Sequence, residues 1–588
     1  MLTGPIVAQR EGDPAVRSCG RATIRRVTEP AEILDQPWDA IVVGTGIGGA
    51  TLGHALAQHG WRVLFCERGA SSARDGEGRG DYPETAFGGG TSAEERLARL
   101  ARAGRWSADI EDRSRADRRG FVPFLGAGTG GSSAIYGMAM ERLFPSDFSP
   151  RRHFPDAGDS TLPETWPIGY EELAPHYVAA ERLYRLRGGP DPLRGADGER
   201  ALRDPPPLTG QGRELAQRLA SKGLHPYRVP MACEFVPGCR CCQGYLCPES
   251  CKNDGERICL QPAIQTGRAQ LIDECEVVRL DASRRNVREV ICNWKGRRIG
   301  LRARVIVLAA GALATPGILL ASASAEWPGG LANVSGLVGR NLMRHFNDLY
   351  ALFPRSVGAA TDNRRKEIAF NDFYESQGAK LGTVQSFGRL PPAEMLLQSM
   401  REDLLLGPAA WAAPLFAMLR PALRPLLRRI VARSAVLATI VEDPPYADNR
   451  VTLAGESPTS RQAGLAIEYR IRPAEQARIR RMRELMRDAL KPMRYLPIRQ
   501  AENNRMLAHA CGTCRFGADP ADSVLDRNNR AHGLDNLYVV DSSFFPSSGG
   551  TNPSLTIAAN ALRVAEHLRG ASGGSAVVAD GEAPIRAA

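Results

Sequence analysis

The sequence predicts an α/β fold, with a parallel sheet whose strands come from segments that lie far apart in the chain. Three apolar stretches predict this sheet, because each is short, rich in Val, Ile and Leu, and ends at a glycine or an acidic residue: 38–46, 304–311 and 536–541. The first runs into an Ala- and Leu-rich helix over 49–60 and then into a second strand over 62–67, which begins a βαβ unit. Long inserts separate the strands, so one domain is expected to interrupt another.

Length and composition are those of a folded protein with more than one structural unit. The chain has 588 residues, of which 43% are hydrophobic and 24% charged, and this balance excludes global disorder. A net charge of +11 permits attraction to anionic partners. The basic residues are spread along the chain, however, and no zinc-finger, RRM or basic-zipper pattern occurs, so nucleic-acid binding is not expected.

Targeting signals are not evident in the sequence. The segment 1–38 mixes charged residues with proline and has no apolar core of a secretory signal. No transmembrane span is expected. The chain is therefore predicted to be cytoplasmic, with export on a signal-bearing partner as the alternative.

The first strand carries a dinucleotide-binding fingerprint. Gly44, Gly46 and Gly49 form a G-x-G-x-x-G between a strand and a helix, and Glu67 ends the next strand. Gly44 allows a tight turn, Gly46 lets the backbone approach a pyrophosphate, and Gly49 permits close packing of the helix, whose N-terminus stabilises phosphate charge. Glu67 is expected to accept hydrogen bonds from the adenosine ribose. The pattern does not separate FAD from NAD.

Five further motifs follow the fingerprint and suggest a family. In order along the chain, the set resembles the successive signatures of the glucose-methanol-choline (GMC) oxidoreductases. They occupy 126–137 (GAGTGGSSAIYG), 311–320 (GALATPGILL), 338–342 (VGRNL), 509–515 (HACGTCR) and 552–556 (NPSLT).

The resemblance implies FAD, a discontinuous Rossmann-like FAD-binding domain and a substrate domain with an antiparallel sheet. Composition predicts an N-terminal extension over 1–36 and a flexible tail, rich in Gly, Ala and Ser, over 571–588. The predicted FAD-binding domain comprises 37–150, 255–345 and 500–570, and the substrate domain comprises 151–254 and 346–499 with a Cys-rich loop at 233–259.

Several residues match cofactor-binding positions of the GMC family. Gly130, Gly131 and Ser132 match the loop around the pyrophosphate and isoalloxazine, and Asp541 matches an acidic FAD-binding position. Val277 matches a backbone contact to the adenine.

Two positions depart from the family pattern. Some GMC relatives attach FAD through a histidine in the loop after the Gly-Gly-Ser motif, where this chain has Ile135, so the FAD is expected to be non-covalent. Tyr136 stands where many relatives have asparagine near the flavin.

His509 and Asn552 are the predicted catalytic residues. Oxidation of an alcohol needs a base at the hydroxyl while the hydride leaves from carbon to flavin N5, and an imidazole with a pKa near ~6.5 suits that work. His509 matches the active-site histidine of the GMC family. Asn552 matches the family's second polar position, from which an amide can hydrogen-bond the developing alkoxide.

Cysteines are concentrated in the Cys-rich loop. Seven of the thirteen cysteines in the chain fall within it, and an iron-sulfur cluster, a structural zinc or disulfide, and unligated thiols are the three interpretations. The run 241–251 is similar to a segment of bacterial FAD-dependent glucose dehydrogenase catalytic subunits, which implies a [3Fe-4S] cluster on Cys242, Cys247 and Cys251. The separate C-x-x-C that ends at Cys514 is accounted for by the GMC motif without thiol chemistry.

The segment 395–439 is rich in Leu, Ala and Arg. We expect a pair of amphipathic helices over the substrate pocket, with Pro414, Pro421 and Pro425 breaking any single long helix. Attachment to a membrane surface or a partner is the alternative.

Three functions are compatible with these patterns. The first is a dehydrogenase that oxidises a sugar, glycoside or polyol and passes electrons through the cluster to a cytochrome or other acceptor. The second is an oxidase that reduces oxygen while tailoring an aminoglycoside, terpenoid or steroid. The third is a flavoprotein relay subunit of a membrane complex. We find no polar constellation in the inserts that identifies the substrate.

Overall fold

The structure is a computed structural model that describes residues 31–572. Residues 35, 72–78, 88–89, 115–119, 196–197, 354–365, 377, 389, 407–409 and 458–459 within that range are outside the description. Most of the predicted extension at 1–36 and of the predicted tail at 571–588 lies outside the described residues.

A five-stranded parallel sheet forms the first layer of the fold. Its order is β20-β10-β1-β2-β6, and every neighbouring pair is parallel. The four strands expected from the sequence are confirmed, and the fifth, β6, was not predicted. The bounds are β1 Trp38–Val43, β2 Val63–Cys66, β6 Ala269–Ile272, β10 Ala303–Leu308 and β20 Leu537–Val539.

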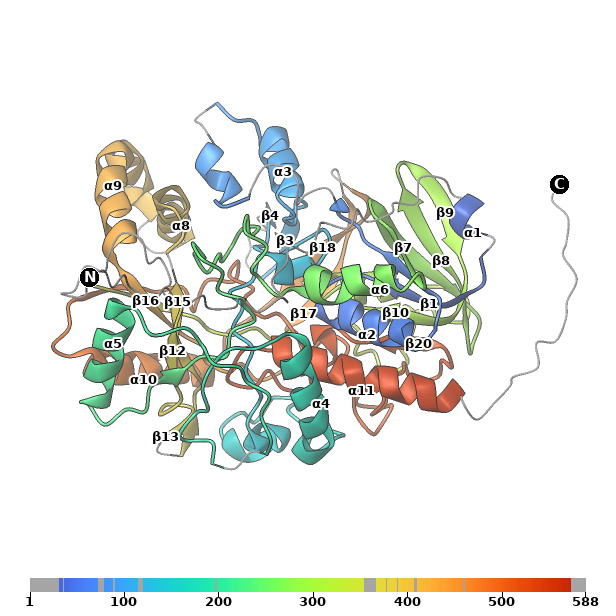
Figure 1. Cartoon of the computed structure of the whole chain (residues 1–588). Helices are drawn as coiled ribbons and strands as arrows, with labels where there is room; N and C mark the ends of the chain where they lie inside the picture. The colour runs from blue at the N-terminus through green and yellow to red at the C-terminus, as the bar shows by residue number, and fades with distance from the viewer. Residues whose placement is uncertain are drawn as a thin grey trace, which may run out of the picture.

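Helices and a small antiparallel sheet cover the two faces of this layer. Figure 1 shows α2 and α11 side by side on one face and strands β7 to β9 on the other. Parallel strands end at a common edge, so the segments after β1, β2, β10 and β20 meet there. The bounds are α2 Ile47–Gln58, α6 Gln261–Gln265, α7 Ala314–Ala321, α11 Ser554–Ser572, β7 Cys275–Ala282, β8 Val287–Trp294 and β9 Arg297–Leu301.

A six-stranded antiparallel sheet forms the second unit, as the fold prediction required. Its order is β19-β11-β16-β15-β12-β5. Its strands are β5 Tyr227–Arg228, β11 Leu349–Leu352, β12 Ile368–Phe370, β15 Val384–Gly388, β16 Ala435–Thr439 and β19 Tyr495–Ile498.

The remaining strands form a four-stranded sheet and a short hairpin, and further helices surround the two main sheets. The strands are β3 Ile110–Asp112, β4 Gly120–Phe121, β17 Arg450–Ser457, β18 Ser460–Glu468, β13 Glu375–Ser376 and β14 Ala379–Lys380. The helices are α1 Ala31–Leu34, α3 Ala93–Arg102, α4 Tyr170–Leu183, α5 Gly210–Ala220, α8 Ala393–Leu406, α9 Ala413–Arg433 and α10 Pro473–Leu490.

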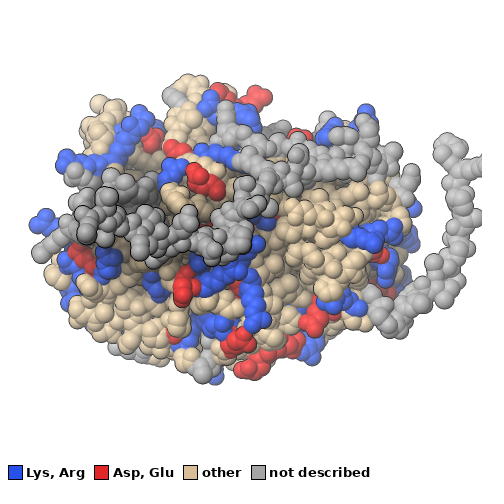
Figure 2. Space-filling model, viewed as in Figure 1, with Lys and Arg blue, Asp and Glu red and all other residues tan. Residues whose placement is uncertain are grey.

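The Leu- and Arg-rich insert forms the expected pair of helices, α8 and α9, but one detail of that prediction is wrong. Helix α9 runs unbroken through Pro421 and Pro425. Both prolines lie on an exposed part of the helix, where water can solvate the carbonyls that lose a backbone partner. Trp411 and Met418 are 77% and 78% exposed. In Figure 2 the α9 region, at the upper left, carries mostly tan and blue atoms.

No helix within the described residues is both long enough and apolar enough to cross a membrane.

Candidate active site

A cavity of about 450 Å³ lies where the carboxyl ends of the parallel strands face the antiparallel sheet. Gly44 and Glu67, which follow β1 and β2, line one part of it. Gln385 of β15 and Ala438 of β16 line another part. Of the fourteen residues that we predicted from the sequence, the cavity brings together nine: Gly44, Gly46, Glu67, Gly131, Ser132, Val277, His509, Asp541 and Asn552.

The glycine fingerprint forms a tight turn between β1 and α2. Gly44 has a φ of +98°, and a Cβ there would stand 2.4 Å from the Ala309 carbonyl oxygen. A Cβ on Gly49 would stand 2.2 Å from the Gly44 oxygen, so this glycine lets α2 pack against the strand. Gly46, at the N-terminus of α2, has no atom within 4 Å of its Cβ position. Its backbone therefore borders open space within the cavity.

The second glycine loop packs directly on the first. Gly130 and Gly131 have φ angles of +83° and +51°, and a Cβ on Gly131 would stand 3.0 Å from the Gly46 Cα. The Gly130 amide donates a hydrogen bond of 3.1 Å to the Thr45 hydroxyl. Ser132 accepts a hydrogen bond from the Gly126 amide at 3.1 Å.

Glu67 connects the two glycine loops through its carboxylate. One oxygen accepts hydrogen bonds from the amide and the hydroxyl of Thr45, at 3.1 and 2.6 Å. The other accepts from the amides of Gly69 and Gly128, at 3.1 and 3.2 Å. Burial raises the pKa of this carboxyl, and these hydrogen bonds oppose that rise. Glu67 therefore stabilises the shape of the site itself, and its predicted ribose contact stays a prediction.

Asp541 has the same role at the end of β20. Its carboxylate accepts hydrogen bonds from the Gly311 amide at 2.9 Å, from the Ser543 amide at 2.8 Å, and from the hydroxyls of Thr315 and Ser543. Burial raises its pKa. Asp541 thus joins the turn after β10 to the segment after β20.

Two residues that depart from the GMC pattern also line the cavity. Ile135 is buried and offers no atom for a covalent bond to a cofactor. Tyr136 donates its hydroxyl hydrogen to the Asn253 carbonyl at 2.5 Å.

His509 is paired with His345, a residue that we did not select from the sequence. The Nδ1 atoms of the two rings lie 2.8 Å apart, and His345 Nε2 lies 2.7 Å from the Gly549 carbonyl. A carbonyl can only accept, so His345 carries its proton on Nε2 and its Nδ1 accepts from His509 Nδ1. This chain of hydrogen bonds leaves His509 Nε2 as an unprotonated acceptor.

Both histidines are held in the neutral form. Burial lowers the pKa of His345 to about 4. Burial, together with the neighbouring His345 and Lys366, holds the pKa of His509 well below its usual value. A neutral His509 that lines the cavity can accept a proton, which is what the sequence analysis required of it.

The cavity also contains a group of side-chain amides, of which only Asn552 was predicted from the sequence. In the described part of the chain, four buried amide oxygens that line the cavity have no hydrogen-bond partner. They come from separate segments, so no spacing in the sequence connects them. They are Gln243 Oε1, Asn347 Oδ1, Gln385 Oε1 and Asn552 Oδ1.

Thiols of the Cys-rich loop gather close together. The sulfur of Cys251 lies 3.3 Å from that of Cys239 and 3.5 Å from that of Cys247, and Cys239 lies 3.6 Å from Cys233. The tightest group of three sulfurs is therefore Cys233, Cys239 and Cys251. Of the predicted cluster ligands, Cys247 and Cys251 are in contact, and Cys242 pairs with Cys247, which raises the Cys242 pKa.

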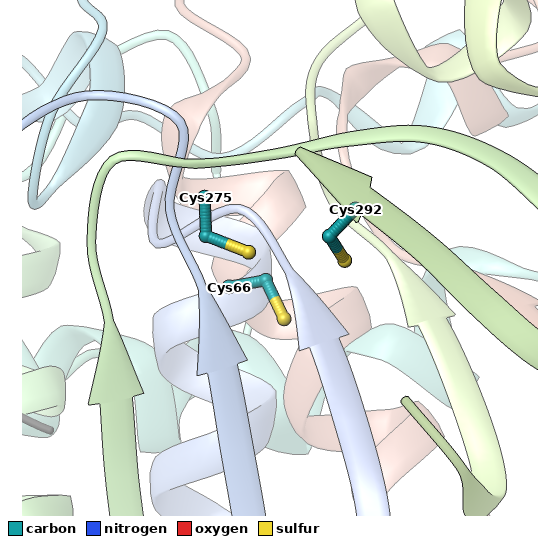
Figure 3. Close-up of side chains that lie close together, drawn as sticks. All are labelled: Cys66, Cys275 and Cys292. Carbon is teal, nitrogen blue, oxygen red and sulfur yellow. The ribbon is translucent and has the colours of Figure 1, made fainter. Parts of the chain in front are cut away.

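A second group of buried thiols was not predicted. Figure 3 shows Cys66, at the end of β2, with Cys275 of β7 and Cys292 of β8. Their sulfurs all lie within 4.8 Å of one another. Metal–thiolate bonds of about 2.3 Å place bound sulfurs about 4 Å apart, so the spacing suits a soft metal ion as well as packed thiols. Cys66 and Cys275 also line the cavity.

A dinucleotide fingerprint and a neutral buried histidine on one cavity define the class of protein: an oxidoreductase that binds a dinucleotide cofactor. More specifically, the chain belongs to the GMC oxidoreductases. Family models described as GMC oxidoreductase match its residues 227–347 and 445–561, which are the N- and C-terminal domains of that family. It is therefore an enzyme that acts on CH-OH groups, and its family implies FAD.

Known proteins resemble the chain over most of its length. It is 29% identical over 562 residues to paromamine 6'-oxidase of Streptomyces fradiae, and this alignment covers 91% of the chain and 92% of the relative. It is 24% identical over 571 residues to the fructose dehydrogenase large subunit of Gluconobacter japonicus, with coverage of 90% and 97%. The crystal structure of pyridoxine 4-oxidase from Mesorbium loti shares the fold, with a TM-score of 0.59, 21% identity and coverage of 91% and 99%.

Proposed function

We propose that the protein is an FAD-dependent dehydrogenase that oxidises a CH-OH group of a sugar, glycoside or polyol. The observation that carries the proposal is the group of four unpartnered amide oxygens that line the same cavity as His509. Buried polar groups without partners are costly, so such a group favours a ligand that brings several hydroxyl donors. Relatives named for paromamine and fructose are consistent with such a ligand.

The residues at the opposite end of the cavity fit the cofactor. Gly44 and Gly46 would hold the pyrophosphate at the N-terminus of α2, with Gly130, Gly131 and Ser132 against it. Val277 and the neighbouring Glu276 would border the adenosine, and Glu67 and Asp541 keep the loops in place. When bound, FAD supplies the acceptor for the substrate hydride.

The protein's own contribution is to move a proton and to orient the substrate oxygen. His509 accepts the hydroxyl proton at Nε2, while the hydride leaves from the carbon in the same oxidation. His345 fixes the tautomer by accepting from His509 Nδ1. The amide nitrogen of Asn552 donates to the developing alkoxide without competing for the proton.

We further propose that the Cys-rich loop carries electrons away from the site to a cytochrome or other acceptor. Soft thiolates suit an iron-sulfur cluster, and Cys242, Cys247 and Cys251 are the proposed [3Fe-4S] ligands. Two observations support the location: the sulfurs of Cys247 and Cys251 are in contact, and Gln243, next to Cys242, lines the cavity. Direct reduction of oxygen is the competing reaction.

Anaerobic mixing of the holoenzyme with a panel of alcohols, sugars and glycosides tests the main proposal. Sugars or polyols should bleach the flavin absorbance faster than simple alcohols do, and a preference for apolar alcohols would contradict the proposal. Acid precipitation should release the flavin, because Ile135 offers no covalent anchor.

The electron route is tested by iron content and by peroxide yield. The relay requires about three irons per flavin, and Cys251→Ser should lose the cluster absorbance while substrate still reduces the flavin. Near-zero iron together with stoichiometric hydrogen peroxide would identify an oxidase instead. One equivalent of zinc would make the loop a structural site.

A further inference from the structure

One buried cation faces the part of the cavity that contains His509. Lys366 is only 4% exposed, precedes β12 and lines the cavity. Gly137 makes room for it: a Cβ there would stand 2.5 Å from Lys366 Nζ and 2.6 Å from Gln243 Oε1. The ammonium group therefore lies beside one of the unpartnered amides. Among the described residues, Lys366 forms no ion pair and no side-chain hydrogen bond.

The carboxylates of the cavity do not balance this charge. Those that line it are Glu67, Glu276 and Asp541, and all three lie at the end of the glycine fingerprint. Glu67 and Asp541 each already accept four hydrogen bonds. Within the described part of the chain, the end of the cavity with His509 therefore carries a lysine and amides but no acidic side chain.

Glu141, Cys241 and Lys252 are the charged and thiol groups around Lys366 outside the cavity. Glu141 Oε2 accepts from the Tyr227 hydroxyl and lies 4.0 Å from Arg194, whereas Glu141 Oε1 is buried and has no hydrogen-bond partner among the described residues. Lys252 donates to the carbonyls of Ala134 and Tyr245. The Cys241 thiol and Glu141 attract the ammonium group, while Lys252 repels it.

Burial without a partner is costly for a cation. Burial lowers the pKa of Lys366 to about 8, so the charged form is less stable than in water but still predominates at neutral pH. A ligand that brings a negative charge would remove that cost, whereas a ligand that brings a positive charge would increase it. A single ammonium group balances a single negative charge, which favours a carboxylate over a phosphate dianion.

We propose that Lys366 is a specificity-determining residue that binds a carboxylate of the substrate, so that the preferred substrate is a sugar acid or a similar polyhydroxylated carboxylic acid. The inference rests on the proposed function, because it assigns the substrate class of the same cavity. The amides bind the hydroxyl groups, Lys366 binds the carboxylate, and His509 accepts the proton of the hydroxyl that is oxidised. Polycationic aminoglycosides are disfavoured by the same charge.

Matched substrates test the proposal on the holoenzyme. The anaerobic rate of flavin reduction is measured as kcat/KM with gluconate, glucuronate, glucose and glucosamine. The acids should exceed glucose by at least about tenfold, and glucosamine should be slower than glucose. Glucose or glucosamine as the best substrate of the four would overturn the proposal.

Lys366→Gln then tests the residue itself. The acid-to-glucose ratio of kcat/KM should fall about tenfold or more, because one partner of a buried charge pair is removed. Lys366→Arg should retain most of the ratio. Lys222→Gln, which removes an exposed lysine after α5, is the matched control and should leave the ratio unchanged.

Two other results with Lys366→Gln would show that Lys366 does not bind a substrate carboxylate. An equal loss for acids and glucose overturns the proposal. A changed flavin midpoint potential with an unchanged ratio also overturns it, because Lys366 would then act on the cofactor.

Equilibrium binding separates this inference from the proposed function. If no sugar in the panel reduces the flavin, the proposed substrate class fails. Gluconate should still bind the oxidised holoenzyme with a lower dissociation constant than sorbitol, as measured by the change in the flavin spectrum. Lys366→Gln should abolish that difference, and equal binding of gluconate and sorbitol by the unmodified enzyme would refute the carboxylate site.

Discussion

The two ends of the cavity differ in how far their polar groups are satisfied without a ligand. At the end of the glycine fingerprint, Glu67 and Asp541 each accept four hydrogen bonds from the protein. At the other end, buried amide oxygens such as those of Gln385 and Asn552 have no partner in the described part of the chain. The first end is therefore built by folding, and the second is completed by a ligand. Substitutions at the two ends should affect different measurements.

The largest effect is expected at His509, the proposed base that accepts the substrate's hydroxyl proton. His509→Ala should leave FAD bound and the fold intact but slow flavin reduction about 100-fold to 10,000-fold, the usual scale of general base catalysis. The measurement is the anaerobic rate of flavin reduction at saturating substrate. His225→Ala changes an exposed histidine and is the control. Wild-type rates in His509→Ala would show that the base lies elsewhere.

Glu67 tests the end that is built by folding. Glu67→Ala should weaken FAD binding by about 1 to 3 kcal/mol, and it should also lower the melting temperature of the apoprotein, because Thr45, Gly69 and Gly128 lose their acceptor. Flavin retention and thermal unfolding of the apoprotein are the measurements. Loss of FAD affinity with unchanged apoprotein stability would mean that the carboxylate acts on the cofactor alone.

His345 tests how the base is positioned. His345→Gln should slow flavin reduction about tenfold, since one hydrogen bond of about 1.4 kcal/mol to the base is lost. His509 is active when neutral, so activity falls as pH falls through its pKa. His345 helps to lower that pKa, so its removal should move the acid limb of the pH profile to higher pH. An equal slowing at every pH would indicate a structural role instead.

The sequence predicted the satisfied end of the cavity far better than the other. Gly44, Gly46 and Glu67 belong to one local pattern in which each residue has a defined job, and all three line the cavity; their contacts with a cofactor stay predictions. Strand β6 was missed because four residues of mixed character carry little periodic signal.

Apart from His509 and Asn552, the unsatisfied end could not be predicted, because its other residues share no pattern. Gln243, Asn347, Lys366 and Gln385 come from separate loops and strands, and only the packing of the antiparallel sheet against the parallel one brings them together. His345 lies just after the 338–342 motif, which was the available signal for it. Two further features stay predictions: the cluster on Cys242, Cys247 and Cys251, and the domain boundaries.

The smallest effect is expected at Gln385, and it sharpens the comparison most directly. Its side-chain oxygen is buried without a partner before substrate binds, so Gln385→Leu removes a polar group that costs free energy in the unliganded protein. The variant should therefore keep or slightly raise the melting temperature, while kcat/KM for the sugar substrate falls about 2-fold to 10-fold through the loss of one hydrogen bond. Gln270→Leu is a matched control, because its side-chain oxygen is also unpartnered but lies outside the cavity. A lower melting temperature with unchanged kinetics would show that Gln385 stabilises the fold, and the contrast between the two ends would then fail.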